Sequence, residues 1–359
     1  MGNFKEVIRI AGAFVGVIVG AGFASGQELM QFFTSFGLIG LAGSMISIAL
    51  FIFLAMALSS LGQQYTSSSH KPIVYAICGK YLGIFVDALI TFFMFALAVV
   101  MIAGGGALGE QLFGIPKLWG SVAVTVLTVL IVCMNVRQVI TFIGAATPLL
   151  ALMVIIVSVV AFSGHEADLH ALEAAASTLP RGAGNWVIGA LLYVSYNIIA
   201  GAPFLIIMGG QSLDRKTAVW GGVLGGVLLG LLMLMIVGSM FARADILAGV
   251  PMPMLLLATQ FSPFVGIVMG VAIFGMILNT AVGVLYSFSA RLLEPGTMKF
   301  RLGTVAAGIL AFAGSLAGFV QLVGTVFPFF GYLGFVLMIC TLVGWLRLRS
   351  GTLRLIEAA

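Results

Sequence analysis

Long apolar runs separated by short polar or glycine-rich breaks fill almost the whole chain. About 20 consecutive apolar residues suffice for an α-helix to cross the hydrocarbon core of a bilayer. Reading each run as one span predicts ten transmembrane helices. They are expected at Val7–Phe33, Phe36–Gly62, Ile84–Gly109, Leu118–Val136, Val139–Ser163, Asn185–Gly209, Thr217–Phe241, Pro263–Ala290, Leu302–Gly318 and Gln321–Leu346.

Composition narrows the class of protein. Of the 359 residues, 62% are hydrophobic and 8% are charged, and the mean hydropathy is +1.23. Soluble domains carry about 25% charged residues, so a soluble globular enzyme is excluded. The 16 Lys and Arg residues are spread over short loops and form no basic patch for nucleic acid. The expected partners are membrane lipid and a small-molecule solute, with no bound cofactor.

The positive charges predict an orientation. With a cytoplasmic amino terminus, the segments outside the membrane hold only Lys117, Arg181 and Arg243 of the 16 Lys and Arg residues. Cytoplasmic loops of membrane proteins are enriched in Lys and Arg. Both termini are therefore expected in the cytoplasm, which requires an even number of spans.

Two breaks indicate an internal repeat. The first span contains a glycine-rich run at residues 20–26, and the sixth contains Ser195–Pro203, where proline removes a backbone donor. Ala21 and Gly201, within these breaks, lie 180 positions apart, as do Pro148 and Pro328 in spans five and ten. Because five spans reverse the direction of entry, the second copy is inverted. We therefore expect an all-α membrane protein with a 5+5 inverted repeat whose helices 1 and 6 are broken.

This repeat divides the chain into a first half, residues 1–164, and a second half, residues 185–346. An extracellular loop, residues 165–184, joins them, and a cytoplasmic tail, residues 347–359, follows. In the loop, Leu169, Leu172 and Leu179 recur at helical spacing, which predicts a surface helix.

Broken helices in equivalent places of two inverted halves are typical of secondary transporters, with the solute bound at the break. A broken helix exposes backbone amides and carbonyls that bind charged groups without a charged side chain. Amides near Gly22–Gly26 are expected to hold a carboxylate, and nearby carbonyls to hold sodium or an ammonium group. The expected solute-binding residues are Gly20, Ala21, Gly22, Phe23, Ala24, Ser25, Gly26, Ser195, Tyr196, Asn197 and Gly201.

Glu28 follows the first break, and a carboxylate within a span indicates a functional role. Gln27 and Gln31 flank it on the same polar stripe. Glu28 is either a proton carrier or a structural carboxylate, and both interpretations stay open.

The run Gly12–Glu28, with ten spans and a broken sixth helix, resembles the YkvI family of bacterial membrane proteins. The architecture is more distantly similar to the LeuT-like fold of the amino acid–polyamine–organocation superfamily. In sodium-coupled transporters of that fold, carbonyls of the first helix and oxygens of the eighth bind sodium. The resemblance places these ligands at the carbonyls of Gly16, Val19 and Met276 and at the side chains of Asn279 and Thr280.

The sequence also departs from those transporters. Phe23 replaces an asparagine of their second sodium site, so that site is not expected here. Gly20 replaces the aspartate of amine transporters, which favours a solute with its own carboxylate. Gly26 replaces the arginine of their outer gate. An inner gate is expected from Lys5 or Arg9 with Glu294.

The sequence thus predicts a sodium-coupled symporter for a small zwitterion, most simply an amino acid, and not an enzyme. Proton coupling through Glu28 is one alternative. The other is a ligand-sensing receptor subunit, because spore germinant-receptor subunits share this fold.

Overall fold

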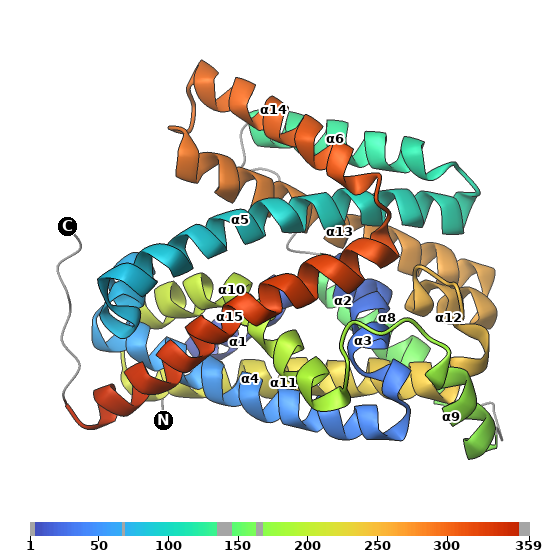
Figure 1. Cartoon of the computed structure of the whole chain (residues 1–359), viewed down its shortest axis with the longest axis horizontal. Helices are drawn as coiled ribbons and strands as arrows, with labels where there is room; N and C mark the ends of the chain where they lie inside the picture. The colour runs from blue at the N-terminus through green and yellow to red at the C-terminus, as the bar shows by residue number, and fades with distance from the viewer. Residues whose placement is uncertain (1–3, 67–68, 135–145, 163–167, 352–359) are drawn as a thin grey trace.

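The computed structural model describes residues 4–66, 69–134, 146–162 and 168–351, and within them every regular element is a helix. The helices lie side by side along the longest axis of the molecule (Figure 1). Their bounds are α1 Phe4–Ile18, α2 Ala21–Ser25, α3 Gln27–Phe32, η1 Thr34–Phe36, α4 Leu38–Gln64, α5 Lys71–Phe113, α6 Lys117–Cys133, α8 Ala146–Phe162, α9 Leu169–Ser177, α10 Trp186–Gly210, α11 Arg215–Ala242, η2 Ala244–Ile246, α12 Pro253–Phe261, α13 Pro263–Leu292, α14 Met298–Ser315 and α15 Phe319–Arg349.

Six of these helices, α4, α5, α10, α11, α13 and α15, are long and apolar enough to cross a membrane. The predicted spans at these six places are therefore confirmed as apolar helices. The shorter apolar helices α6 and α8 cover two more predicted spans, and residues 139–145 of the fifth predicted span lie outside the described residues. The total of ten spans stays a prediction.

Both ends of the chain point to one end of the bundle. α1 begins and α15 ends at the left of Figure 1, which we call the terminal end, whereas α9 and α12 lie at the opposite, far end. The predicted surface helix is α9, and Asp168 caps it by accepting a hydrogen bond from the His170 amide. The sequence did not predict α12. It also did not predict the first turns of α5, which precede the expected span. A kink at Gly79, with φ of 77°, separates these turns from the rest of the helix.

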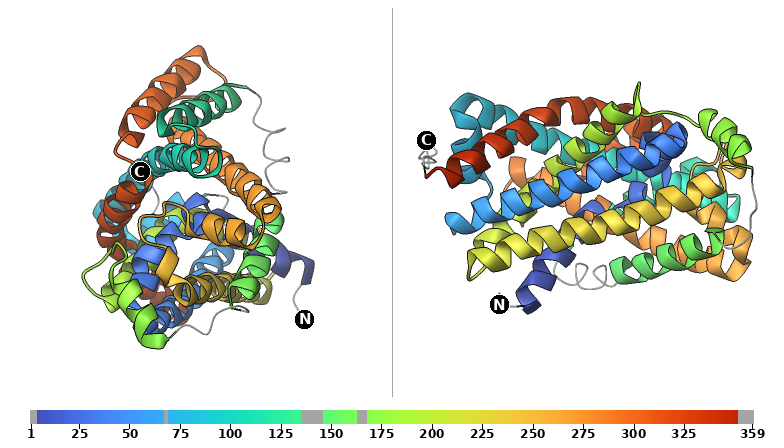
Figure 2. Two further views of the ribbon diagram at one scale, coloured as in Figure 1. Left: turned by 90° about the vertical axis from the view of Figure 1, so that its right-hand side faces the viewer. Right: turned by 90° about the horizontal axis from the view of Figure 1, so that it is seen from below.

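Small residues set the closest helix contacts. α4 packs along both α10 and α11. A Cβ added at Gly222 on α11 would lie 2.6 Å from the carbonyl oxygen of Ala55 on α4, so no larger side chain fits there. On the other side of the molecule, α6 and α14 lie outermost, over α5 and α13 (Figure 2).

The prediction of a break in the sixth span is wrong. α10 runs as one helix from Trp186 to Gly210, through Ser195 and past Pro203. Proline removes one backbone hydrogen bond and crowds the carbonyl of the preceding turn, and a helix packed on both sides by other helices tolerates this cost. α10 lies between α4 and α15 and is mostly buried. Tertiary packing therefore offsets the local cost of the proline.

Candidate functional site

The first span is interrupted twice. α1 ends at Ile18, the Gly20 amide donates to the Ile18 carbonyl, and α2 adds a single short helix before Gly26. Gly26 has a φ of 81°, in the left-handed region that favours glycine, and α3 starts directly after it. The predicted break is confirmed, but the run 20–26 is not fully unwound, because Ala21–Ser25 is helical.

The end of α1 leaves backbone acceptors free. The Val19 and Gly20 amides donate to the carbonyls of Val15 and Ile18. Within the described residues, no backbone amide donates to the carbonyls of Gly16 or Val19. Such carbonyls at a helix end bind cations.

A small cavity lies against this break, with about 20 Å³ of space for the centres of water molecules. That volume holds about one water-sized particle. It brings together five residues that the sequence predicted for the site: Gly20, Glu28, Tyr196, Asn197 and Thr280. The other lining residues are Val17, Ile18, Phe93, Leu97, Met101, Ala200 and Phe327.

Glu28 is the acidic residue of this cavity. Its side chain is 6% exposed, and its Oε2 accepts a 2.7 Å hydrogen bond from the Tyr196 hydroxyl. The Glu28 side chain packs directly against Gly22, where an added Cβ would overlap the carboxylate. The carboxylate is therefore held between the backbone of α2 and one side of α10.

Aromatic rings and polar side chains form the rest of the lining. Tyr196 stacks on Phe327 with ring centroids 4.7 Å apart, and Phe93 lies 6.4 Å from Tyr196. Asn197 donates to the Tyr193 carbonyl, which holds its amide in place. Phe93 and Phe327 belong to α5 and α15, so their roles depend on a tertiary arrangement that the sequence did not reveal.

Thr280 lies on α13, opposite Gly20. A Cβ at Gly20 would sit 3.6 Å from Thr280 Oγ1, an ordinary contact. Met276 and Asn279, the other predicted oxygen donors of α13, do not line the cavity. Met276 lies inside the unbroken helix α13.

Other predicted solute-binding residues have packing roles. Ser195 donates to the Gly331 carbonyl on α15, at 2.6 Å, and a Cβ at Gly201 would contact Ile18 and Phe14 of α1. Some of the predicted amides are also occupied. The amides of Ala24 and Gly26 donate to carbonyls of the same segment, and the Gln27 amide donates to Ser25 Oγ. These amides are not free for a carboxylate of the solute.

The polar stripe on α3 makes a glutamine layer on the far side of the cavity. With its side-chain amide oriented to suit its neighbours, Gln27 Nε2 donates to the carbonyls of Val250 and Pro251, at 3.2 and 3.0 Å. Gln27 Oε1 then accepts from Gln31 Nε2 at 2.8 Å. Gln31 Nε2 also donates to the carbonyl of Val320 at 3.0 Å. These bonds join α3 to the segment before α12 and to the start of α15.

A third glutamine, which the sequence analysis missed, extends this layer. The side-chain amide of Gln111 on α5 donates to the Met252 carbonyl and accepts from the Met252 amide, both at 2.9 Å. A glutamine near a helix end carries no signal of such a partner in the sequence. We call Gln27, Gln31 and Gln111 with their carbonyl partners the glutamine latch.

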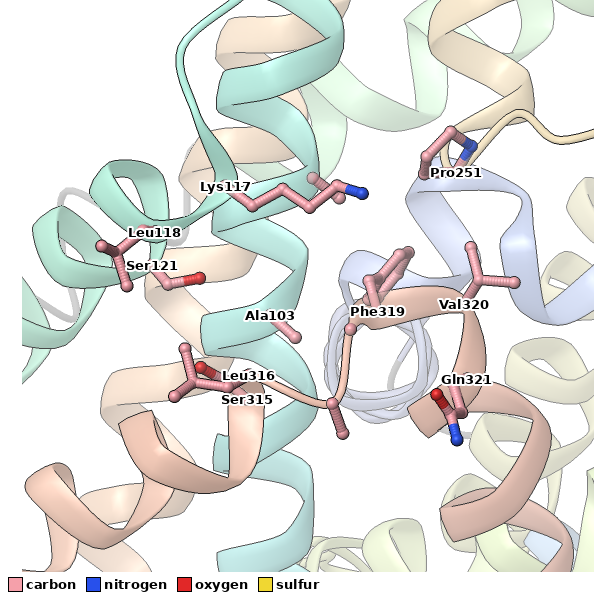
Figure 3. A pocket seen from close by; sticks show the side chains of 13 residues that line it. Ala103, Lys117, Leu118, Ser121, Pro251, Ser315, Leu316, Phe319, Val320 and Gln321 are labelled. Carbon is pink, nitrogen blue, oxygen red and sulfur yellow. The ribbon is translucent and has the colours of Figure 1, made fainter.

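A larger pocket, of about 280 Å³, borders the latch, and Figure 3 shows the side chains that line it. Its lining comes from α5, α6 and the turn between α14 and α15, and it includes Pro251 and Val320, both of which accept bonds of the latch. Lys117, which also lines it, pairs with Glu110 at 3.2 Å. The latch therefore shares two of its carbonyl partners with the wall of this pocket.

The expected inner gate is not formed in this conformation. Among the described residues, neither Lys5 nor Arg9 pairs with Glu294. Arg291, three residues before Glu294, instead pairs with Asp87 of α5 at 2.8 Å. His70 and Lys71 also lie within 3.5 Å of this carboxylate. This network joins α5 to α13, and among the described residues no side chain at the start of α1 takes part in it.

The packing of α1 explains why the gate is unpaired. α1 packs on α10 and α11 and, within the described residues, makes no comparable contact with α8 or α13. Its first turns project from the bundle (Figure 2), and Phe4 is 72% exposed. The start of α1 therefore lies apart from α8 and α13 at the terminal end.

No family model matches the chain. The chain is similar to two proteins of Bacillus subtilis strain 168. It is 25% identical to the membrane protein YkvI over 90% of this chain and 92% of YkvI, and 24% identical to the protein YyaD over 92% and 94%. The expected resemblance to YkvI is confirmed.

Solved structures show the fold. MhsT in complex with L-phenylalanine matches with a TM-score of 0.60, 15% identity, and coverage of 95% of this chain and 88% of MhsT. The inward-facing conformation of Mhp1 matches with a TM-score of 0.58, 14% identity, and coverage of 91% and 73%. A Na⁺-coupled sialic acid symporter matches with a TM-score of 0.59, 14% identity, and coverage of 90% and 78%. The chain has the LeuT-like fold.

Proposed function

We propose that this protein is a secondary transporter that moves a small organic solute bearing an amino group, an amino acid or a related zwitterion, by alternating access. The observation that carries the proposal is the cavity at the break of the first span, with Glu28, Tyr196, Asn197 and Thr280 on its wall. A midplane site at a broken helix is typical of secondary transporters. Two neighbours that share this fold support it: MhsT, solved in complex with L-phenylalanine, and the Na⁺-coupled sialic acid symporter.

The helix packing supports the 5+5 inverted repeat. Exchange of the two halves pairs α1 with α10, α4 with α11, α5 with α13, α6 with α14 and α8 with α15. Under this exchange the contact of α4 with α10 corresponds to that of α11 with α1. The contact of α5 with α15 corresponds to that of α13 with α8, and the contact of α5 with α6 to that of α13 with α14. All six contacts occur. An inverted repeat predicts such correspondences because each half packs alike.

Two correspondences are weak or missing. α10 packs on α15 and α5, but the equivalent contacts of α1 with α8 and α13 are not made to a comparable extent in the described residues. Alternating access by rocking of one half against the other predicts this kind of asymmetry. We therefore propose that the structure is close to the state that is open at the terminal end. With both termini in the cytoplasm of a bacterial cell, as the positive charges favour, this state faces inward.

Sodium is the coupling ion that we favour. The free carbonyls of Gly16 and Val19 lie at the end of α1, and Thr280 Oγ1 lies across the break. Oxygen donors suit a hard cation. In the present conformation Met276 and Asn279 are outside the cavity, so closure of α1 against α13 would have to complete the ligand set.

Proton coupling is the second candidate, because Glu28 is a buried carboxylate on the cavity wall. Such a group in a membrane protein is typical of proton relays. No second acidic side chain lines this cavity, however, so a relay would have to end at Glu28.

Counterflow in liposomes tests the proposed function. Purified protein is reconstituted with unlabelled amino acids and amines inside, and uptake of the labelled compound is followed in sodium and in potassium buffer at fixed pH. We expect sodium-dependent uptake of at least one compound. Ligand binding without any counterflow would contradict transport and favour a receptor, and uptake that follows the proton gradient alone would favour proton coupling.

A further inference from the structure

Glu28 is a buried carboxyl group in the solute cavity, and no cationic side chain of the described residues lies beside it. Within the described residues, the ion pairs involve Asp87 and Glu110, which lie elsewhere, and no Lys, Arg or His lines this cavity. The Tyr196 hydroxyl supports the carboxylate at 2.7 Å but brings no positive charge. A buried carboxylate without a cation is costly, and either a bound proton or a ligand that brings positive charge relieves that cost.

The surroundings of Glu28 suit an organic cation. The rings of Phe93, Tyr196 and Phe327 line the same cavity, and Phe93 and Phe327 lie 6.5 Å apart. Ring faces attract an ammonium group, by about 0.5–2 kcal/mol depending on its desolvation. Leu97 and Met101 add apolar surface beside the rings. In their chemistry, a carboxylate, aromatic faces and apolar walls together match a protonated amine attached to a small apolar group. The cavity has to widen to admit one, because in this conformation it holds about one water-sized particle.

The same lining offers little to an anion. A carboxylate of the solute would face Glu28, with no cationic side chain to balance it. The backbone amides of Ala24 and Gly26 already donate to the carbonyls of Gly20 and Phe23. The side chain of Glu28 covers Gly22 itself. The protein's own carboxylate thus takes the place that the sequence analysis assigned to a carboxylate of the solute.

We propose that Glu28 is the counter-ion of a protonated amino group on the transported solute, and that a carboxylate on the solute adds nothing to its binding. The site then takes small primary amines at least as well as the amino acids with the same side chain. This inference rests on the proposed transport function and narrows its substrate class.

Matched ligands test the inference on purified full-length protein. The probes are phenylalanine with phenethylamine, leucine with isoamylamine, and the N-acetylated forms of both amino acids. Binding is measured by calorimetry, in sodium and in potassium. We expect each amine to bind at least as tightly as its amino acid, and the N-acetylated compounds, which lack the cation, not to bind.

Variants connect this preference to Glu28. Glu28→Gln keeps the shape and removes the charge, and should weaken amine binding at least tenfold. Glu28→Asp keeps the charge one methylene further back, and should retain the preference for amines with lower affinity. The matched control Glu110→Gln, which changes a carboxylate at the far end of α5, should leave binding unchanged.

Several outcomes would overturn the inference. They are binding of an amino acid but not of its amine, binding of the N-acetylated compounds, absence of binding by every amine, or unchanged amine affinity in Glu28→Gln. A loss of sodium dependence with unchanged amine affinity would make Glu28 a ligand of the metal ion instead. The proposed function fails separately, when no solute of any charge shows counterflow in liposomes.

Discussion

Tyr196 on α10 donates a 2.7 Å hydrogen bond to Glu28 on α3, whereas the hydroxyl of Tyr193, one turn earlier on the same helix, is buried without a hydrogen-bond partner in the described part of the chain. The two rings pack edge to face, 5.5 Å apart. Two neighbouring tyrosines of α10 therefore differ in one bond to the cavity carboxylate.

This difference makes a paired test of the bond. Tyr196→Phe removes a hydrogen bond to a carboxylate, which is worth about 1.5–3 kcal/mol when the acceptor is charged. Tyr193→Phe removes a buried hydroxyl that makes no bond, so the free energy of unfolding should stay the same or rise. Thermal unfolding in detergent should therefore give a lower Tm for Tyr196→Phe alone. Equal losses in both variants would show that the bond to Glu28 contributes nothing.

The first-span break was predictable because its cause is local. Glycine and serine in the run 20–26 disfavour regular helix whatever surrounds them, and Gly26 adopts a backbone angle that favours glycine. The continuity of α10 was not predictable in the same way. Its proline signals a break in sequence, but burial between α4 and α15 decides the outcome.

The residues of the site likewise divide into those that the sequence could predict and those whose role depends on tertiary packing. A role for Glu28 could be predicted because a carboxylate within an apolar run is costly. The structure places this residue on the cavity wall. Phe93 and Phe327 are two of 28 phenylalanines, and nothing in the sequence separates them from residues that face lipid. Gln111 likewise acquires its role only when Met252 folds against it. Partners far apart in sequence are set by tertiary packing.

Thr280 tests the sodium site. Thr280→Val keeps the shape of the side chain and removes its oxygen, so sodium-dependent uptake should weaken at least tenfold, as the loss of about 1.4 kcal/mol implies. The control is Thr304→Val on α14, whose hydroxyl is buried without a hydrogen-bond partner among the described residues. Sodium titrations of uptake in liposomes measure both. An unchanged sodium dependence in folded Thr280→Val would reject Thr280 as a ligand.

Cysteine labelling tests the orientation. With Cys78, Cys133 and Cys340 replaced by alanine, single cysteines are introduced at Ser177 in α9 and at Ser350 after α15, both exposed. The bias of Lys and Arg predicts that Ser177→Cys reacts with an impermeant thiol reagent in intact cells. Ser350→Cys should react only after the cells are opened. The reverse pattern would place the termini outside.

The glutamine latch predicts how the far end opens. Gln27 and Gln31 tie α3 to the segment before α12 and to α15, and two carbonyls that accept these bonds, those of Pro251 and Val320, belong to residues that line the larger pocket. Neutral hydrogen bonds contribute about 0.5–1.5 kcal/mol each. Replacing both residues by leucine removes several of them and should shift the equilibrium about tenfold or more towards the state open at the far end.

A cysteine at Ala200, on the cavity wall, reports this shift. In the cysteine-free background, Ala200→Cys should react slowly with an impermeant reagent from outside intact cells, and about tenfold faster when Gln27→Leu and Gln31→Leu are added. Gln211→Leu, an exposed glutamine at the end of α10, is the matched control and should not change the rate. If the double variant labels no faster than the control, the latch does not hold the far end closed, and the packing of α10 on α15 must do so instead.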